Sequence, residues 1–120
     1  MATTDKAVTI APYFRIPESS LDRFKALCEK FVASTETEEN VLFYGFTFNG
    51  TLAHCRESYA DADALLAHLE NVSELIGEAL TFVDLERLEI HGMAGEIDKL
   101  REPLSELSPD FFELEYGFRR

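Results

Sequence analysis

Apolar and polar residues alternate most clearly on either side of one Asn-Gly pair. Two apolar-rich runs, residues 41–48 and 51–59, flank Asn49-Gly50. Asn-Gly favours a type I′ turn, because both central residues of that turn take positive φ angles, so the pattern predicts a β-hairpin. A two-residue turn at this pair would place Tyr44 opposite Cys55.

Both faces of this predicted hairpin carry apolar residues. One face is expected to hold Leu42, Tyr44, Phe46, Phe48, Ala53, Cys55, Glu57 and Tyr59. The opposite face is expected to hold Phe43, Thr47, Leu52, His54 and Arg56. A sheet with apolar residues on both faces is typically covered on both sides. A register slip of one residue would exchange the two faces.

The chain before the hairpin is predicted to form a strand and an amphipathic helix. Residues 8–16 have the pattern of a strand, and Pro12, which lacks an N–H group, places it at a sheet edge or at a bulge. Ser19 and Ser20 are candidate helix caps, and the helix is expected to end near Ser34. Its core positions are Leu21, Phe24, Leu27, Cys28, Phe31 and Val32.

The chain after the hairpin begins with helical patterns. Asp61 is a good cap for a helix that runs through Leu69, and a second helical segment is expected at residues 73–80. Residues 86–91 then alternate between apolar and charged side chains, which predicts a returning strand.

One further helix and one further strand are predicted at the end of the chain. The helix covers residues 95–102 and is stopped by Pro103, and the strand covers residues 111–119. The order is then β-α-β-β-α-β, the ferredoxin-like split βαβ arrangement, with a C-terminal α-β extension. We therefore expect an α+β protein with a single domain over residues 1–120.

A ferredoxin-like sheet with helices on one face leaves its other face uncovered. The ten Phe residues also suggest more apolar surface than one small core uses. The sheet of a second copy would cover this face most simply, which predicts a two-fold homodimer. The final strand, residues 111–119, is a candidate to extend the sheet edge of the partner.

The net charge of the chain restricts the kinds of molecule that it can bind. The formal net charge of -12 disfavours nucleic acid and anionic membranes, because both are bound through clustered Lys and Arg. No run approaches a transmembrane helix and the first residues do not resemble a signal peptide, so we expect a cytoplasmic protein. Cys28 and Cys55 are expected to be reduced and buried. The acidic run at residues 36–39 is interpreted as solvated surface.

Two stretches of the chain match motifs of one known protein family. Residues 38–44, Glu-Glu-Asn-Val-Leu-Phe-Tyr, are similar to a Glu-Pro-Gly-x-x-x-Tyr segment at the start of the second strand. Residues 57–64, followed by His68, resemble a Glu-x-aromatic-x-Asp-x-x-Ala-x-x-x-His stretch at the third strand and second helix. On these motifs the chain resembles the antibiotic biosynthesis monooxygenase family of dimeric α+β barrels, and the likeness in layout extends over about residues 8–92.

The resemblance implies a ferredoxin-like dimer with a pocket between sheet and helices. It further implies oxygenation of an electron-rich phenol, quinol or anthrone without metal, flavin or any other cofactor. The protein would bind the aromatic substrate, accept its proton and let the resulting anion reduce oxygen. The chain departs from some of these oxygenases because it has no Trp and because it carries the C-terminal extension.

Glu57 and His68 are the candidate catalytic residues. Burial of Glu57 on the face of Tyr44 and Cys55 would raise its pKa and make it a base or a hydrogen-bond donor. His68 is a candidate base or proton shuttle. The alternatives are a salt bridge of Glu57 at a strand end and a His68 that bonds backbone or water.

Four further residues are candidates for the wall of a substrate pocket, and the alternative for each is ordinary packing. They are Tyr44, Tyr59, Phe46 and Cys55. His54 and His91 show no metal-ligand spacing, so no metal site is predicted. Hydrolase, nucleotide and dinucleotide motifs find no match in the sequence.

These observations leave three hypotheses for function. The leading one is a homodimeric, cofactor-independent monooxygenase that acts on a small aromatic, quinol or anthrone-type compound. The second is a dimer that binds a small ligand without catalysis. The third is an isomerase or a haem-handling enzyme on the same scaffold.

Overall fold

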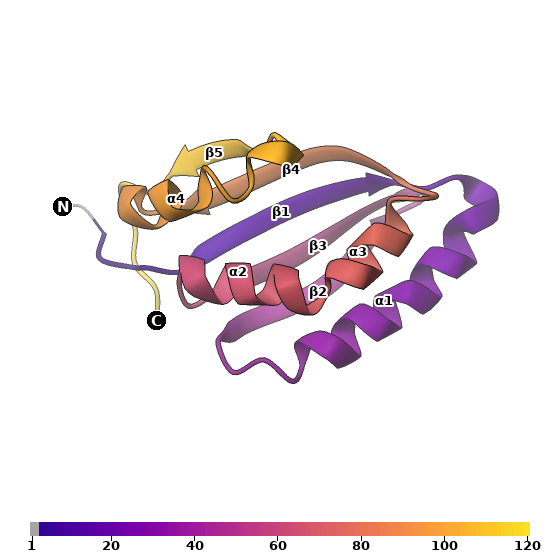
Figure 1. The fold of residues 1–120 in the computed structure, drawn as a ribbon, viewed down its shortest axis with the longest axis horizontal. Helices are drawn as coiled ribbons and strands as arrows, with labels where there is room; N and C mark the ends of the chain where they lie inside the picture. Colours follow the sequence, from indigo (N-terminus) through magenta and orange to yellow (C-terminus); the bar gives the residue numbers. More distant parts are fainter. Residues whose placement is uncertain (1–2) are drawn as a thin grey trace.

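The computed structural model describes residues 3–120 and contains one mixed sheet with the strand order β2-β3-β1-β4-β5 (Figure 1). The strands are β1 (Val8–Arg15), β2 (Val41–Asn49), β3 (Leu52–Tyr59), β4 (Asp84–Gly92) and β5 (Asp110–Glu113). The helices are α1 (Leu21–Thr35), α2 (Ala62–Asn71), α3 (Ser73–Ala79) and α4 (Ala94–Leu100), with 3-10 turns η1 (Glu18–Ser20) and η2 (Ser105–Leu107). The predicted α+β order, including the C-terminal α-β extension, is therefore confirmed.

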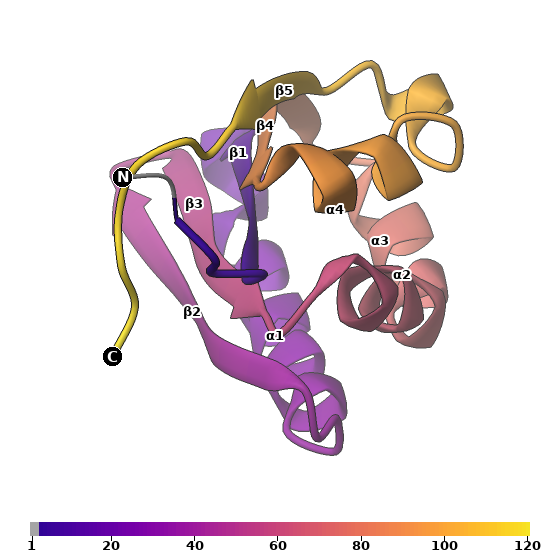
Figure 2. The same ribbon diagram turned by 90° about the vertical axis from the view of Figure 1, so that its left-hand side faces the viewer.

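The helices lie on one side of the sheet and leave the other side open (Figure 2). Phe43 of β2 and Phe112 of β5 are exposed, at 40% and 43%. The Arg56 guanidinium lies over the Phe43 ring at 4.4 Å, and the His91 ring stacks on Phe112 at 4.6 Å. The sheet does not close on itself within one chain, so the barrel of the predicted dimer remains a prediction.

Pro12 lies in a central strand, which corrects the prediction of a sheet edge. β1 pairs with β3 on one side and with β4 on the other. The alternative prediction, a bulge, describes the site better, because the register with β4 shifts between Tyr13 and Phe14. The missing N–H of Pro12 removes one ladder bond, and its carbonyl instead contacts Nδ1 of His54 at 2.9 Å.

The hairpin is confirmed, but its turn lies one residue later than predicted. Asn49 pairs with Leu52, so the turn residues are Gly50 and Thr51. Gly50 alone has a positive φ, of 60°, which fits a type II′ turn with Gly first. From Phe43 to Asn49 each residue of β2 therefore meets a partner two positions beyond the expected one, and a shift of two preserves the predicted faces. A register shift between Val41 and Phe43 ends this agreement, because it pairs Val41 with Tyr59 and leaves Leu42, predicted for the same face, unpaired.

The cap of α1 also differs from the prediction. Ser20 occupies the N-cap position of α1 but makes no side-chain cap hydrogen bond. The turn η1 precedes the helix, and Ser20 N–H donates to the carbonyl of Pro17 at 2.8 Å. The helix begins as a continuation of this tight turn, which replaces the side-chain cap.

Two carboxylates hold the start of α2. Asp61 Oδ1 accepts from Ala64 N–H at 2.8 Å, as predicted for an N-cap. Glu96 of α4, which is buried, accepts from Ala62 N–H at 2.9 Å. Each satisfies an amide that a helix start leaves free. Because α2 carries His68, these two bonds also fix the position of one candidate site residue.

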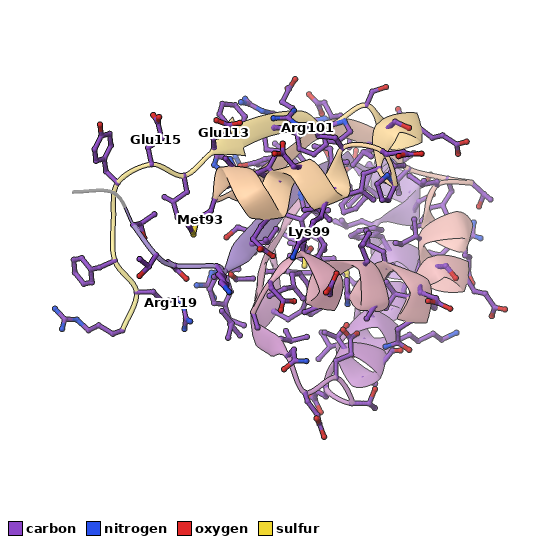
Figure 3. The ribbon with its side chains drawn as sticks, turned by 60° about the vertical axis from the view of Figure 1, so that its left-hand side comes forward. Met93, Lys99, Arg101, Glu113, Glu115 and Arg119 are labelled. Carbon is purple, nitrogen blue, oxygen red and sulfur yellow. The ribbon has the colours of Figure 1, made fainter. Side chains whose placement is uncertain are left out.

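The predicted last strand is shorter than expected. β5 pairs in parallel with residues 89–92 of β4 and ends at Glu113, whereas the prediction reached residue 119. β4 itself ends at Gly92, so the later residues have no neighbouring strand to pair with. The tail turns towards the N-terminal segment, where Arg119 contacts Asp5 at 3.0 Å (Figure 3).

Both cysteines are free and buried, as predicted. Within residues 3–120, none of the helices combines the length and apolar character of a membrane span.

Candidate functional site

A cavity of about 70 Å³ lies between the helix-covered face of the sheet and helices α1, α2 and α3. Its walls are almost entirely apolar. Four lining residues can donate or accept hydrogen bonds through their side chains, namely Tyr44, Cys55, Glu57 and His68. Phe46 also lines the cavity, so five of the six residues predicted for a site meet there.

Strand pairing brings the polar residues to one place. Tyr44 of β2 pairs with Glu57 of β3, and Phe46 pairs with Cys55. Paired residues of antiparallel strands point to the same face, so these four side chains form one patch. Tyr59 is two residues beyond Glu57 on β3 and therefore shares its face. It contacts Glu57 without lining the cavity.

Glu57 is a carboxyl group enclosed in apolar surroundings, with 4% of its surface exposed. Burial raises its pKa to about 7, and the nearby Glu38 carboxylate acts in the same direction. Hydrogen bonds from Tyr59 and Cys55 oppose this shift. The Tyr59 hydroxyl donates to Oε1 of Glu57 at 2.5 Å. Near neutral pH the carboxyl is thus present in both its protonated and its ionised form.

His68 lies between two carboxyl groups. Nδ1 contacts Oε2 of Glu38 at 2.9 Å, while Nε2 lies 3.6 Å from Oε1 of Glu57. Burial lowers the pKa of His68, although Glu38 partly opposes the shift. The Glu38 contact favours a proton on Nδ1, which leaves Nε2 as an acceptor directed at Glu57.

Glu38 is a site residue that the sequence did not identify. It follows α1 in the loop before β2, where the acidic run was interpreted as solvated surface, yet its side chain is only 14% exposed. Asn71 at the end of α2 donates to its Oε2 at 2.9 Å and to the Ser34 carbonyl at 3.1 Å. The family-like segment beginning at residue 38 held the only available signal.

The two tyrosines form aromatic walls around His68. Ring centroids lie 4.9 Å from His68 for Tyr59 and 5.3 Å for Tyr44. Burial raises the pKa of both hydroxyls, which therefore stay protonated and act as hydrogen-bond donors. Burial also raises the pKa of the Cys55 thiol, which makes it a poor nucleophile.

The other two histidines lie outside this cavity. His54 stacks on Tyr13, and His91 contacts Glu89 at 3.1 Å. Over residues 3–120 no three His, Cys, Asp or Glu side chains gather as a metal site would need. The groups at and beside the cavity are suited to moving protons: a carboxyl with a pKa near neutrality, an imidazole whose neutral form is favoured, the Tyr44 hydroxyl in the wall and the Tyr59 hydroxyl bonded to Glu57.

Comparison with solved structures places the fold among proteins of known architecture. The crystal structure of MupZ from Pseudomonas fluorescens is 50% identical in sequence and has a TM-score of 0.92. The match covers 96% of this chain and 95% of MupZ. No protein-family model matches the chain, and no curated protein matches it significantly.

More distant structures share the fold. An antibiotic biosynthesis monooxygenase is 17% identical, with a TM-score of 0.61 over 69% of this chain and 92% of the other. A protein from Bacteroides thetaiotaomicron, described as a possible oxidoreductase, is 15% identical, with a TM-score of 0.65 over 72% of this chain and 97% of the other. The fold expected from the resemblance to antibiotic biosynthesis monooxygenases is therefore confirmed.

Proposed function

The chain belongs to the same family as MupZ from Pseudomonas fluorescens, and we propose that it is a cofactor-independent enzyme that moves protons on a small, largely apolar molecule. The observation that carries this proposal is the carboxyl of Glu57, whose pKa is about 7 inside an apolar cavity. A catalytic acid or base works best when its pKa lies near the working pH. Glu57 meets this condition without any metal or cofactor.

In the proposed reaction Glu57 exchanges a proton with the substrate. The Tyr59 hydroxyl, which donates to Glu57 Oε1 at 2.5 Å, stabilises the ionised form of the carboxyl. Tyr44 lies on the wall beside it and supplies a second hydroxyl donor for an oxygen of the substrate. Phe46 and Cys55 complete the apolar wall, which excludes water and strengthens these interactions.

His68 and Glu38 form the route by which Glu57 returns to its starting state. Nε2 of His68 accepts the proton from Glu57, while Nδ1 releases its own proton to Glu38. The Glu38 side chain is 14% exposed and so reaches solvent, whereas His68 is 3% exposed. The 3.6 Å gap between Nε2 and Oε1 exceeds a hydrogen bond, so transfer requires a small movement or a bridging group.

The finer hypothesis is oxygenation of a phenol, quinol or anthrone, and the antibiotic biosynthesis monooxygenase fold supports it. For a CH₂ group beside a conjugated carbonyl, Glu57 removes one proton and the carbanion reduces oxygen to form a C–O bond. The resulting peroxide takes a proton and then loses water. The net change converts CH₂ and O₂ to C=O and H₂O, so no outside reductant is needed.

A redox-neutral isomerisation is the second candidate, and the protonation of Glu57 favours it. Because the pKa of Glu57 is about 7, the acid and base forms are both available at neutral pH. One carboxyl can then remove a proton at one carbon and deliver a proton to another. Such a reaction consumes no oxygen, which separates the two candidates in a single assay.

The open face of the sheet supports a homodimer as the working form. Phe43 and Phe112 are exposed there, and the face has no covering helix (Figure 2). A second copy would cover both residues through a two-fold interface and complete the α+β barrel. The partner contributes no residue to the proposed chemistry, since Glu57, His68 and Glu38 come from one chain.

Assays of the metal-free protein with a panel of hydroquinones, anthrones and enolisable ketones will decide between these functions. Oxygen uptake supports the oxygenase, and deuterium incorporation from heavy water without oxygen uptake supports the isomerase. Glu57→Gln should abolish either signal. Glu70→Gln, which changes an exposed carboxylate on α2, should leave it unchanged. Ligand binding with neither signal would favour the non-catalytic binding protein.

A further inference from the structure

The cavity has a closed polar end and an open apolar end. Glu57 and His68 are 4% and 2% exposed at the closed end. Of the residues lining the cavity, Leu80 and Leu107 are the two that are exposed, at 39% and 40%. Leu80 follows α3 and Leu107 ends η2, so these two leucines mark the mouth.

A continuous apolar wall connects the two ends. Helices α2 and α3 follow one another along the sheet (Figure 1), and their lining residues run from His68 through Val72 and Ile76 to Leu80. A ligand that enters at the mouth therefore meets apolar side chains of both helices before it reaches Glu57.

The wall offers no compensation for a charged ligand. Among the described residues that line the cavity, none is Lys or Arg. The hydroxyl of Tyr44 and the thiol of Cys55 stay neutral, because burial raises the pKa of each. Glu57 repels an anion whenever it is ionised. Burial lowers the pKa of His68, which favours its neutral form, so an anion placed here would lose its hydration without gaining a counter-charge.

We propose that the site takes a small, uncharged, apolar molecule that passes between Leu80 and Leu107, presents an oxygen group to Glu57 and His68, and excludes carboxylates of the same size. This inference rests on the proposed function for the identity of the reacting end. The charge selection itself follows from the wall and is independent of which reaction occurs.

A matched ligand series tests the charge selection. Binding of 1-hexanol, hexanoate and hexylammonium is followed by NMR of the methyl groups of Leu80, Leu107 and Ile76 at about pH 6, where most of Glu57 is protonated. The alcohol should bind at least about tenfold more tightly than hexanoate, because only the carboxylate must lose charge hydration. Equal or tighter binding of hexanoate or hexylammonium would overturn the proposal.

Variants at the mouth test the route. Leu80→Asp and Leu107→Asp should each weaken 1-hexanol binding at least about fivefold, because a charge replaces apolar surface on the ligand path. Leu107→Trp, which keeps the apolar character, should slow binding by narrowing the mouth. Leu42→Asp changes a leucine of similar exposure on β2 and should have no effect. Unchanged binding in all three mouth variants would contradict the route.

The outcome of the ligand-binding tests can be distinguished from the outcome of the activity test of the proposed function. Selective binding of 1-hexanol without oxygen uptake or deuterium incorporation on any substrate would support this inference and count against catalysis. Turnover of a carboxylate substrate that depends on Glu57 would support catalysis and overturn the charge selection.

Discussion

Nε2 of His68 lies 3.6 Å from Oε1 of Glu57, and burial favours the neutral form of both groups. Burial raises the pKa of Glu57 to about 7 and lowers the pKa of His68. The same physical cause thus moves an acid and a base in opposite directions, because it disfavours the charged form of each. A neutral pair that is easily interconverted with an ion pair is well suited to passing a proton.

Stability should depend on pH through Glu57. Its pKa rises from an ordinary value of 4.5 to about 7 on folding, so between these values the folded chain binds more protons than the unfolded chain. The stabilisation that Glu57 gives the folded state is therefore complete below pH 4.5. It is lost as the pH rises through 7, which lowers the free energy of unfolding by about 3 kcal/mol in total.

Glu57→Gln isolates this contribution. His68, with its lowered pKa, acts in the opposite direction, since its contribution is lost as pH falls below 6.5. Urea unfolding of both proteins across this pH range should show stability falling with pH in the wild type relative to the variant. A constant difference between the two proteins would mean that the pKa of Glu57 is not raised.

Glu38→Gln should lower the pKa of His68 further. The Glu38 carboxylate, 2.9 Å from Nδ1, is the group that counteracts the effect of burial on the imidazole. NMR titration of the His68 ring measures the change directly. Glu39→Gln removes a neighbouring exposed carboxylate and should leave the ring unaffected.

If the route through Glu38 operates, kcat should fall in Glu38→Gln more than KM rises, and an added small acid-base buffer should restore part of the loss.

The predicted site residues came together because strand alternation is a strong constraint. The turn was misplaced by one residue, so Tyr44 meets Glu57 and not Cys55. From Phe43 onward the pairing moved by two positions, and a shift of two returns each side chain to its predicted face. The hairpin residues of the cavity wall, Tyr44, Phe46, Cys55 and Glu57, could therefore be predicted even though the individual pairs could not.

Glu38 was missed because its role depends on long-range packing. It lies 30 residues from His68 in sequence, in a loop whose path is set by the packing of α1 and α2. Asn71, which contacts both Glu38 and the end of α1, and His68 together hold the carboxylate inward. Neither periodicity nor composition carries this information, so the sequence alone gave no reason to distinguish the acidic run at residues 36–39 from ordinary solvated surface. The shortened β5 has a similar cause, since its length depends on how far β4 continues.

Tyr59→Phe should raise the pKa of Glu57 further. The Tyr59 hydroxyl donates to Oε1 of Glu57, and that bond stabilises the ionised carboxyl. Loss of a buried hydrogen bond should also lower the free energy of unfolding by about 1–3 kcal/mol. Carboxyl NMR of Glu57 and urea unfolding measure the two effects. Tyr44→Phe serves as the matched control, because its hydroxyl is not bonded to Glu57; an equal pKa change in both variants would contradict this role for Tyr59.

The dimer should depend on Phe43 and the open face. The ring is 40% exposed and is covered on one side by the Arg56 guanidinium, so it presents apolar surface where the sheet has no helices. Phe43→Asp places a charge on the open face and should convert a dimer to a monomer in sedimentation velocity. Phe48→Asp changes a ring of similar exposure that packs towards Phe24 on the helix side, and it should leave the dimer intact.

Deletion of residues 114–120, which carry two highly exposed aromatic rings, should weaken the dimer if the tail reaches the partner's sheet edge. A wild-type chain that sediments as a monomer at every concentration would contradict the dimer altogether, whereas a dimer that survives the deletion would assign the interface to the open face alone.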